Sequence, residues 1–113
     1  MKRASLVGAL LTASLALSMS AASAAVDADA ATGLAKSNGC MKCHAVDKAK
    51  KGPSYKKIAE KYKGKADAES ALIKSITTGP KVKLDDGSED QHKIIDTKDQ
   101  GKLKNLVNWI MSQ

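Results

Sequence analysis

The segment Cys40-Met41-Lys42-Cys43-His44 places two thiols three positions apart and a histidine directly after the second thiol. This Cys-x-x-Cys-His spacing is typical of covalent haem attachment. Each thiol can add to one vinyl group of a haem, and His44 then lies beneath the iron, where it can supply an axial nitrogen. We therefore predict one covalent haem c, held by Cys40 and Cys43, with His44 as an iron ligand.

Three other interpretations of the two cysteines stay open on the sequence. A thioredoxin-like redox pair needs βαβ units, and we find no strand of useful length. A zinc site could combine Cys40 and Cys43 with His44 and His92, but adjacent ligands at positions 43 and 44 depart from zinc-finger spacings. The third alternative is a plain structural disulfide.

The first 24 residues have the pattern of a secretory signal peptide. Lys2 and Arg3 precede the largely apolar run from Leu6 to Met19, and Ala22-Ser23-Ala24 supplies small residues for cleavage. A membrane anchor or a buried helix is the alternative, but the run is too short to span a bilayer permanently. We predict a mature domain of residues 25–113 in the periplasm, without an integral membrane segment. Haem attachment outside the cytoplasm agrees with this location.

Charge and composition narrow the choice of partners. Without Lys2 and Arg3, 17 lysines and no arginine stand against 12 acidic residues, which gives a net charge of +5. A lysine surface can steer acidic redox partner proteins, although an ordinary solvated surface would look the same. Nucleic-acid binding is not expected, because arginine forks and stacking aromatics are missing. We expect a monomer.

Apolar spacing predicts an all-α fold of four or so short helices around the haem. The chain has no Phe, so only Tyr55, Tyr62 and Trp109 supply aromatic surface, and a buried macrocycle is expected to complete the core. Thr97 with Gln100 resembles a capping box for the last helix. The segment 81–95 reads as a long irregular loop with a turn at Asp85-Asp86-Gly87. The helices are expected at about residues 27–38, 54–64, 67–77 and 97–110.

The mature chain resembles the small bacterial class I cytochromes of the c-551/c-552 type over essentially its whole length. The resemblance implies an electron carrier rather than an enzyme, with the first and last helices crossing beside the haem. It also implies that the Pro53 carbonyl accepts the second ring N–H of His44, and that Trp109 packs near the haem. The haem motif is the specific match, and the weaker segments that accompany it are Leu34-Ala35-Lys36, Gly52-Pro53, 58–64 and 106–110.

The sequence departs from this family in the loop before the last helix, which normally brings a methionine sulfur to the iron. The mature chain has only Met41, between the two cysteines, and Met111, at the end of the last helix. His92 occupies the region instead and is the only other histidine. A neutral imidazole is a good iron ligand, so we predict His92 as the sixth ligand. A lysine (Lys81, Lys83 or Lys93) or an open position is the alternative.

The prediction for function is a low-potential, single-electron carrier, because imidazole in place of a thioether lowers the reduction potential. Lysines near the haem edge would orient an acidic partner; they are Lys48, Lys50, Lys51, Lys56 and Lys57. The alternative function is a haem protein with an open or labile sixth position that binds a diatomic ligand or reacts weakly with peroxide.

Overall fold

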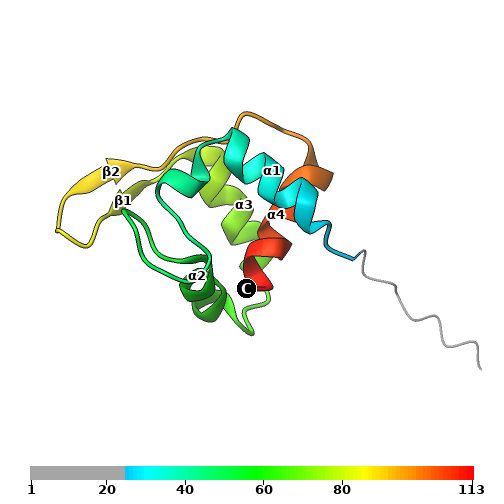
Figure 1. The fold of residues 1–113 in the computed structure, drawn as a ribbon, viewed down its shortest axis with the longest axis horizontal. Coiled ribbons are helices and arrows are strands. Elements are labelled where there is room, and N and C mark those ends of the chain that lie inside the picture. The colour runs from blue at the N-terminus through cyan, green and yellow to red at the C-terminus, as the bar shows by residue number, and fades with distance from the viewer. Residues whose placement is uncertain (1–24) are drawn as a thin grey trace, which may run out of the picture.

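A computed structural model describes residues 25–113, and the predicted signal peptide lies outside this part of the chain (Figure 1). The described residues form four α-helices, one short 3-10 turn and a two-stranded antiparallel hairpin. The all-α prediction is confirmed, because the strands are only three residues each. The elements are α1 (Ala28–Ser37), η1 (Cys40–Lys42), α2 (Tyr55–Tyr62), α3 (Ala68–Thr78), β1 (Lys81–Lys83), β2 (Glu89–Gln91) and α4 (Gln100–Met111).

Short polar side chains begin three of the helices. Asp27 accepts a hydrogen bond from the Ala30 N–H at the start of α1, and Ser54 accepts one from the Lys57 N–H at the start of α2. For α4 the predicted capping box at Thr97 is wrong. Asp99 is the cap and accepts from the Lys102 N–H, whereas the Thr97 hydroxyl accepts from the Asp99 N–H. An Asp carboxylate at the N-cap also interacts favourably with the positive end of the helix dipole. The N-cap of α4 is therefore Asp99, two residues after the predicted cap at Thr97.

The core lies where α4 crosses α1 (Figure 1). The apolar stripe of α4 is buried as its spacing predicted, and the small side chains of Ala31 and Ala35 let α1 approach it closely. Helices α2 and α3 pack against other parts of α4. Burying four aliphatic side chains at about 1.5–3 kcal/mol each makes α4 the largest contributor to the core. The buried stripe consists of Leu103, Leu106, Val107 and Ile110.

The segment between α3 and α4 is more regular than the sequence suggested. The prediction of an irregular loop is wrong for β1 and β2, which pair antiparallel with Lys83 opposite Glu89 and Lys81 opposite Gln91. The predicted turn is present, and Gly87 has a φ of +84° there. Only Val82 and Leu84 alternate with lysines here, a run too short to predict a strand. One pair of opposite charges, Lys83 and Glu89, favours the register.

Among residues 25–113, the structure has no helix with the length and hydrophobicity needed to cross a bilayer.

Candidate functional site

The two cysteines lie on a tight turn at the end of α1. Gly39, with a φ of +70°, ends the helix and leads into η1. Both Cys43 and His44 donate their backbone N–H to the Cys40 carbonyl, at 3.1 and 2.9 Å. Because the chain turns within these five residues, both thiols and the following imidazole belong to one compact unit.

Neither thiol takes part in a disulfide, and both side chains are half-buried. Burial raises the pKa of the Cys40 thiol, while the positive charge of Lys93 acts in the opposite direction. Within the described residues, no group of three or more His, Cys, Asp or Glu side chains is arranged to hold a metal ion. The disulfide and zinc interpretations therefore have no geometric support.

The His44 ring is oriented by a backbone carbonyl. Its Nδ1 lies 2.6 Å from the Pro53 carbonyl oxygen, as the family resemblance implied. A carbonyl can only accept, so Nδ1 carries the proton and Nε2 keeps a free lone pair. Burial lowers the pKa of His44, and the Pro53 carbonyl partly opposes this shift. The ring is thus held as the neutral tautomer that can bind iron through Nε2.

Gly52 leaves room for this ring. A Cβ at position 52 would lie 2.7 Å from Cε1 and 3.1 Å from Nδ1 of His44. The Gly52 N–H also donates to the Cys43 carbonyl at 2.8 Å, which closes the loop from 44 to 53 against the cysteine turn. The absence of a side chain at position 52 is therefore a condition for the His44–Pro53 hydrogen bond.

Replacing Gly52 by alanine is expected to destabilise the protein by about 1–3 kcal/mol, because the methyl group overpacks the site and pushes the imidazole away from Pro53. Urea unfolding followed by haem absorbance measures this loss. Gly33→Ala is the matched control, since a Cβ there meets nothing within 4 Å. In the middle of α1 it should raise stability by about 0.5–1 kcal/mol. Equal stability for Gly52→Ala and the unmodified protein would contradict the steric argument.

Two aromatic residues support the His44 ring from the core. Tyr55 is 2% exposed, and its ring stacks on His44 with centroids 5.4 Å apart and planes at 24°. Trp109, 7% exposed, meets Tyr55 edge-on at 5.2 Å. The Tyr55 hydroxyl donates to the Met41 sulfur at 3.5 Å. Trp109 is thus linked to the cysteine turn through Tyr55. The sequence does not reveal this link, because Tyr55 there has only the spacing of an apolar position in a helix.

The structure brings His92 opposite His44. The two ring centroids are 6.2 Å apart, and the ring planes are inclined at 38°. The Nδ1 of His92 lies 2.9 Å from the Lys93 carbonyl, so by the same reasoning its Nε2 is the free nitrogen. His92 follows β2 directly, and its own N–H donates to the Pro80 carbonyl at 2.9 Å.

This separation fits a single metal ion between the two rings. A metal–imidazole bond is about 2.0 Å, and two such bonds with half the width of each ring add to roughly 6 Å between centroids. The donor set consists of two thiols for covalent attachment and two imidazoles, each with Nδ1 on a backbone carbonyl, so these residues suit a haem iron with two nitrogen ligands.

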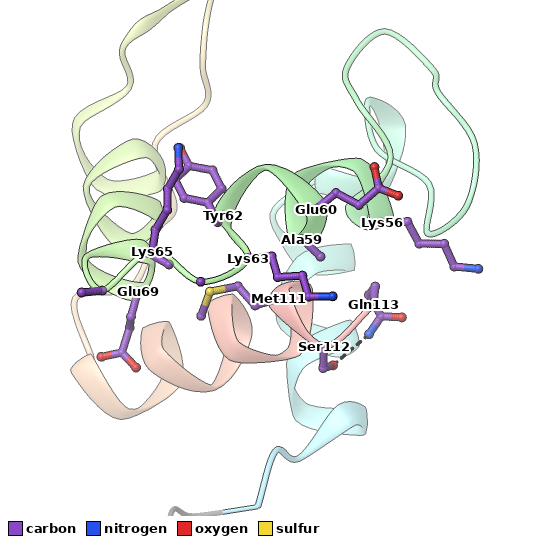
Figure 2. A pocket seen from close by; sticks show the side chains of 13 residues that line it. Lys56, Ala59, Glu60, Tyr62, Lys63, Lys65, Glu69, Met111, Ser112 and Gln113 are labelled. Atoms are coloured by element: carbon purple, nitrogen blue, oxygen red, sulfur yellow. Dashed lines mark hydrogen bonds between the residues drawn. The ribbon is translucent and has the colours of Figure 1, made fainter.

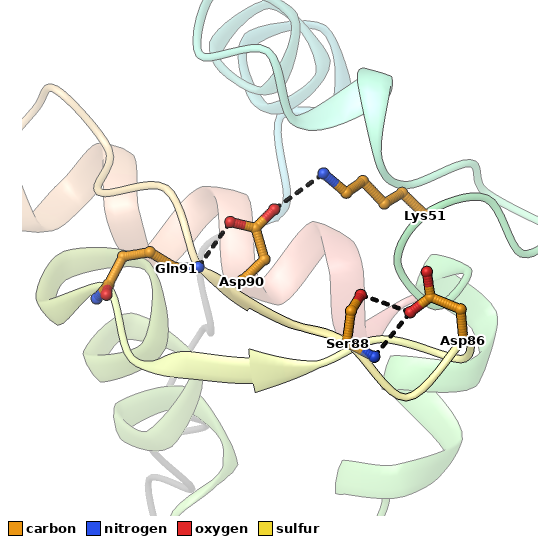
Figure 3. Close-up of polar contacts among 5 residues, drawn as sticks. All are labelled: Lys51, Asp86, Ser88, Asp90 and Gln91. Carbon is orange, nitrogen blue, oxygen red and sulfur yellow. Dashed lines mark hydrogen bonds and ion pairs between the residues drawn. The ribbon is translucent and has the colours of Figure 1, made fainter.

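An ion pair joins the two sides of this site near the solvent. The Lys51 Nζ, in the loop after His44, lies 2.9 Å from the Asp90 Oδ2 on β2 (Figure 3). The hydrogen bond between them raises the pKa of Lys51 and lowers the pKa of Asp90. Because folding lowers the Asp90 pKa, this carboxylate contributes to folding stability at pH values above the Asp pKa of the unfolded chain. Because folding raises the Lys51 pKa, this ammonium contributes at pH values below the Lys pKa of the unfolded chain. The ion pair is therefore intact between about pH 4 and 10. Both side chains are half exposed, at 55% and 50%, and salt weakens such pairs.

The two methionines of the described chain have other neighbours. The Met41 sulfur contacts the Tyr55 hydroxyl. Met111 lines a surface groove of about 630 Å³ between α2, the turn into α3 and the end of α4 (Figure 2). This groove carries both lysine and glutamate side chains and contains neither of the cysteines nor the histidines. This groove is thus separate from the candidate site.

Taken together, the fold and the site define the class of small all-α haem proteins with covalent attachment through two cysteines. The cytochrome c family model matches residues 28–113. The chain belongs to the cytochrome c family, with its two cysteines at the haem-binding position and one covalent haem c. It is an electron-transfer cytochrome.

Several known proteins are similar to the chain. It is 60% identical to class 1 cytochrome MtoD from Sideroxydans lithotrophicus ES-1, with a TM-score of 0.75, over 78% of this chain and 97% of that structure. It is 34% identical to cytochrome c-551 of Pseudomonas aeruginosa, over 71% of this chain and 73% of that protein. It is also 34% identical to cytochrome c-552 of Hydrogenobacter thermophilus, over 70% and 76%. The resemblance stated from the sequence is confirmed at the level of the family.

Proposed function

We propose that the protein is a periplasmic single-electron carrier whose haem iron is bound by His44 and His92 and has a low reduction potential. The observation that carries the proposal is the 6.2 Å separation of the two rings, each with Nδ1 on a backbone carbonyl. A bound haem supplies the reversible ferric–ferrous couple. The chain's own residues hold the two nitrogen donors, exclude water and present a charged surface to partners.

The contacts of the two methionines support a sixth ligand other than a thioether. The Met41 sulfur accepts a hydrogen bond from the Tyr55 hydroxyl, and Met111 lines the separate groove. A thioether favours ferrous iron, whereas an imidazole stabilises ferric iron better. With His92 as ligand, the potential falls below that of methionine-ligated relatives.

We propose further that lysines beside the haem edge guide weak, salt-sensitive docking of acidic redox partners. All five predicted lysines are exposed, but two already have contacts. Lys51 pairs with Asp90, and the Lys50 ammonium donates to the Met41 carbonyl at 2.9 Å. Lys48, Lys56 and Lys57 are therefore the ones most available to a partner. Falling electron-transfer rates with rising ionic strength would support this docking, and rates independent of salt would contradict it.

The optical spectrum of the purified ferrous protein tests the ligation. Sharp low-spin bands that carbon monoxide leaves unchanged are expected, because both axial positions are occupied. Broad high-spin bands that shift at once with carbon monoxide would contradict the proposal and favour a ligand-binding haem protein. The intact mass of the exported protein, expected to equal residues 25–113 plus one haem, tests the signal peptide and the covalent attachment.

A further inference from the structure

Three backbone N–H groups of the segment 92–96, here called the distal segment, donate hydrogen bonds that hold it in place. The His92 N–H donates to the Pro80 carbonyl at 2.9 Å, and the Ile95 N–H donates to the Ile76 carbonyl at 2.8 Å. The Asp96 N–H donates to the side-chain Oδ1 of Asn38 at 3.0 Å. The first two bonds connect the distal segment to α3 and its C-terminal end. The third connects it to α1, two residues before the first cysteine.

Asn38 is built into the interior at this point. It is 1% exposed, and its side-chain Nδ2 donates to the Leu34 carbonyl at 3.0 Å. Its backbone N–H already satisfies the same carbonyl at 3.1 Å, so the end of α1 does not need the amide side chain. A buried amide is costly unless it is fully paired. The interaction with the Asp96 N–H, 58 positions away in sequence, is what the side chain adds.

We propose that Asn38 is a positioning residue for the sixth iron ligand. By fixing Asp96 relative to the cysteine turn, its amide sets the separation between the wall that carries His44 and the segment that carries His92. This inference rests on the proposed ligation by His92. The ion pair of Lys51 and Asp90 joins the same two walls from the outside, but it is half exposed and more easily screened. The Asn38 side chain is 1% exposed, so its bond to Asp96 is less open to solvent than the ion pair.

Removing the amide should loosen the distal segment on the side of α1, while its bonds to Pro80 and Ile76 and its connection to β2 remain. His92 should therefore dissociate from iron more often. Carbon monoxide can bind ferrous haem only while His92 is away. We expect Asn38→Ala to raise the rate of carbon monoxide binding on the order of tenfold, which is typical for the loss of one buried hydrogen bond. Amide hydrogen exchange at Asp96 should accelerate in parallel. Both measurements use the holoprotein.

Asn105→Ala is the matched control. The Asn105 side chain also makes two long-range hydrogen bonds, accepting from the Asp27 N–H and donating to the Asp27 carbonyl, both at 2.9 Å. It links the start of α1 to α4, away from the distal segment. This variant should lower the midpoint of urea unfolding without changing carbon monoxide binding. Equal carbon monoxide rates in the two variants would overturn the proposal, because Asn38 would then have a purely structural role.

His92→Ala separates a failure of this inference from a failure of the proposed function. No change in carbon monoxide binding in His92→Ala would mean that His92 is not the ligand. Rapid binding in His92→Ala together with unchanged binding in Asn38→Ala would reject the role of Asn38 alone. Should Asn38→Ala not fold, Asn38→Ser keeps a polar group there but is too short to place an oxygen at the Oδ1 position, and the same increase is expected.

Discussion

Replacement of His92 by alanine is expected to convert the six-coordinate, low-spin haem into a five-coordinate or water-ligated, high-spin haem. The conversion should be nearly complete, because His92 is the only histidine besides His44 and its ring centroid lies 6.2 Å from that of His44. The ferrous variant should bind carbon monoxide within the mixing time, whereas the unmodified protein should bind it only slowly, at the rate at which His92 leaves the iron. Added imidazole should restore the low-spin spectrum by filling the vacated position. Optical spectra with and without carbon monoxide measure each of these changes.

Lys93→Ala is the matched control for this experiment. Lys93 is the next residue in the chain and was one of the alternative ligands. Its Nζ lies 3.9 Å from where a Cβ at Gly39 would be, so its ammonium group lies beside the cysteine turn. The control should keep the low-spin spectrum. If His92→Ala stayed low-spin while Lys93→Ala became high-spin, a lysine would be the ligand and the proposed His92 ligation would be wrong.

The local part of this site was predictable from the sequence because its chemistry lies in consecutive residues. Five residues from Cys40 to His44 supply both thiols and one imidazole, and the turn that Gly39 begins brings them together. The helices were predictable for a similar reason, since the stripe of Leu103, Leu106, Val107 and Ile110 faces one direction at helical spacing.

The contacts across the site depend on tertiary structure. The 6.2 Å approach of His92 to His44 needs the hairpin of β1 and β2, whose strands are three residues each and whose second strand is entirely polar, too weak a pattern to predict. The hydrogen bond between Asn38 and Asp96 joins residues 58 positions apart. From the sequence, Asn38 indicates only the end of the first helix, because Asn is common at helix ends for purely local reasons. Long-range pairing of this kind leaves no local pattern in a single sequence.

Replacement of His92 by methionine provides the second large effect, a rise in the reduction potential on the order of 100 mV or more. A thioether stabilises ferrous iron relative to ferric iron. The His92 ring centroid lies 6.2 Å from that of His44, so position 92 is close enough for a new ligand. Spectroelectrochemical titration measures the potential, and the spectrum must remain low-spin so that the sulfur is known to be bound. A low-spin variant with an unchanged potential would show that the axial ligand does not set the low potential.

Ile94→Met distinguishes ligation from the mere presence of sulfur near the haem. Ile94 is 55% exposed and lies two residues beyond His92 in the same distal segment. A methionine there leaves His92 in place, so the potential and the low-spin spectrum should stay those of the unmodified protein. A comparable rise in both variants would mean that the polarity around the haem, rather than the ligand, controls the potential. A rise confined to His92→Met would assign the potential to one side chain, the imidazole that the hairpin and Asn38 hold opposite His44.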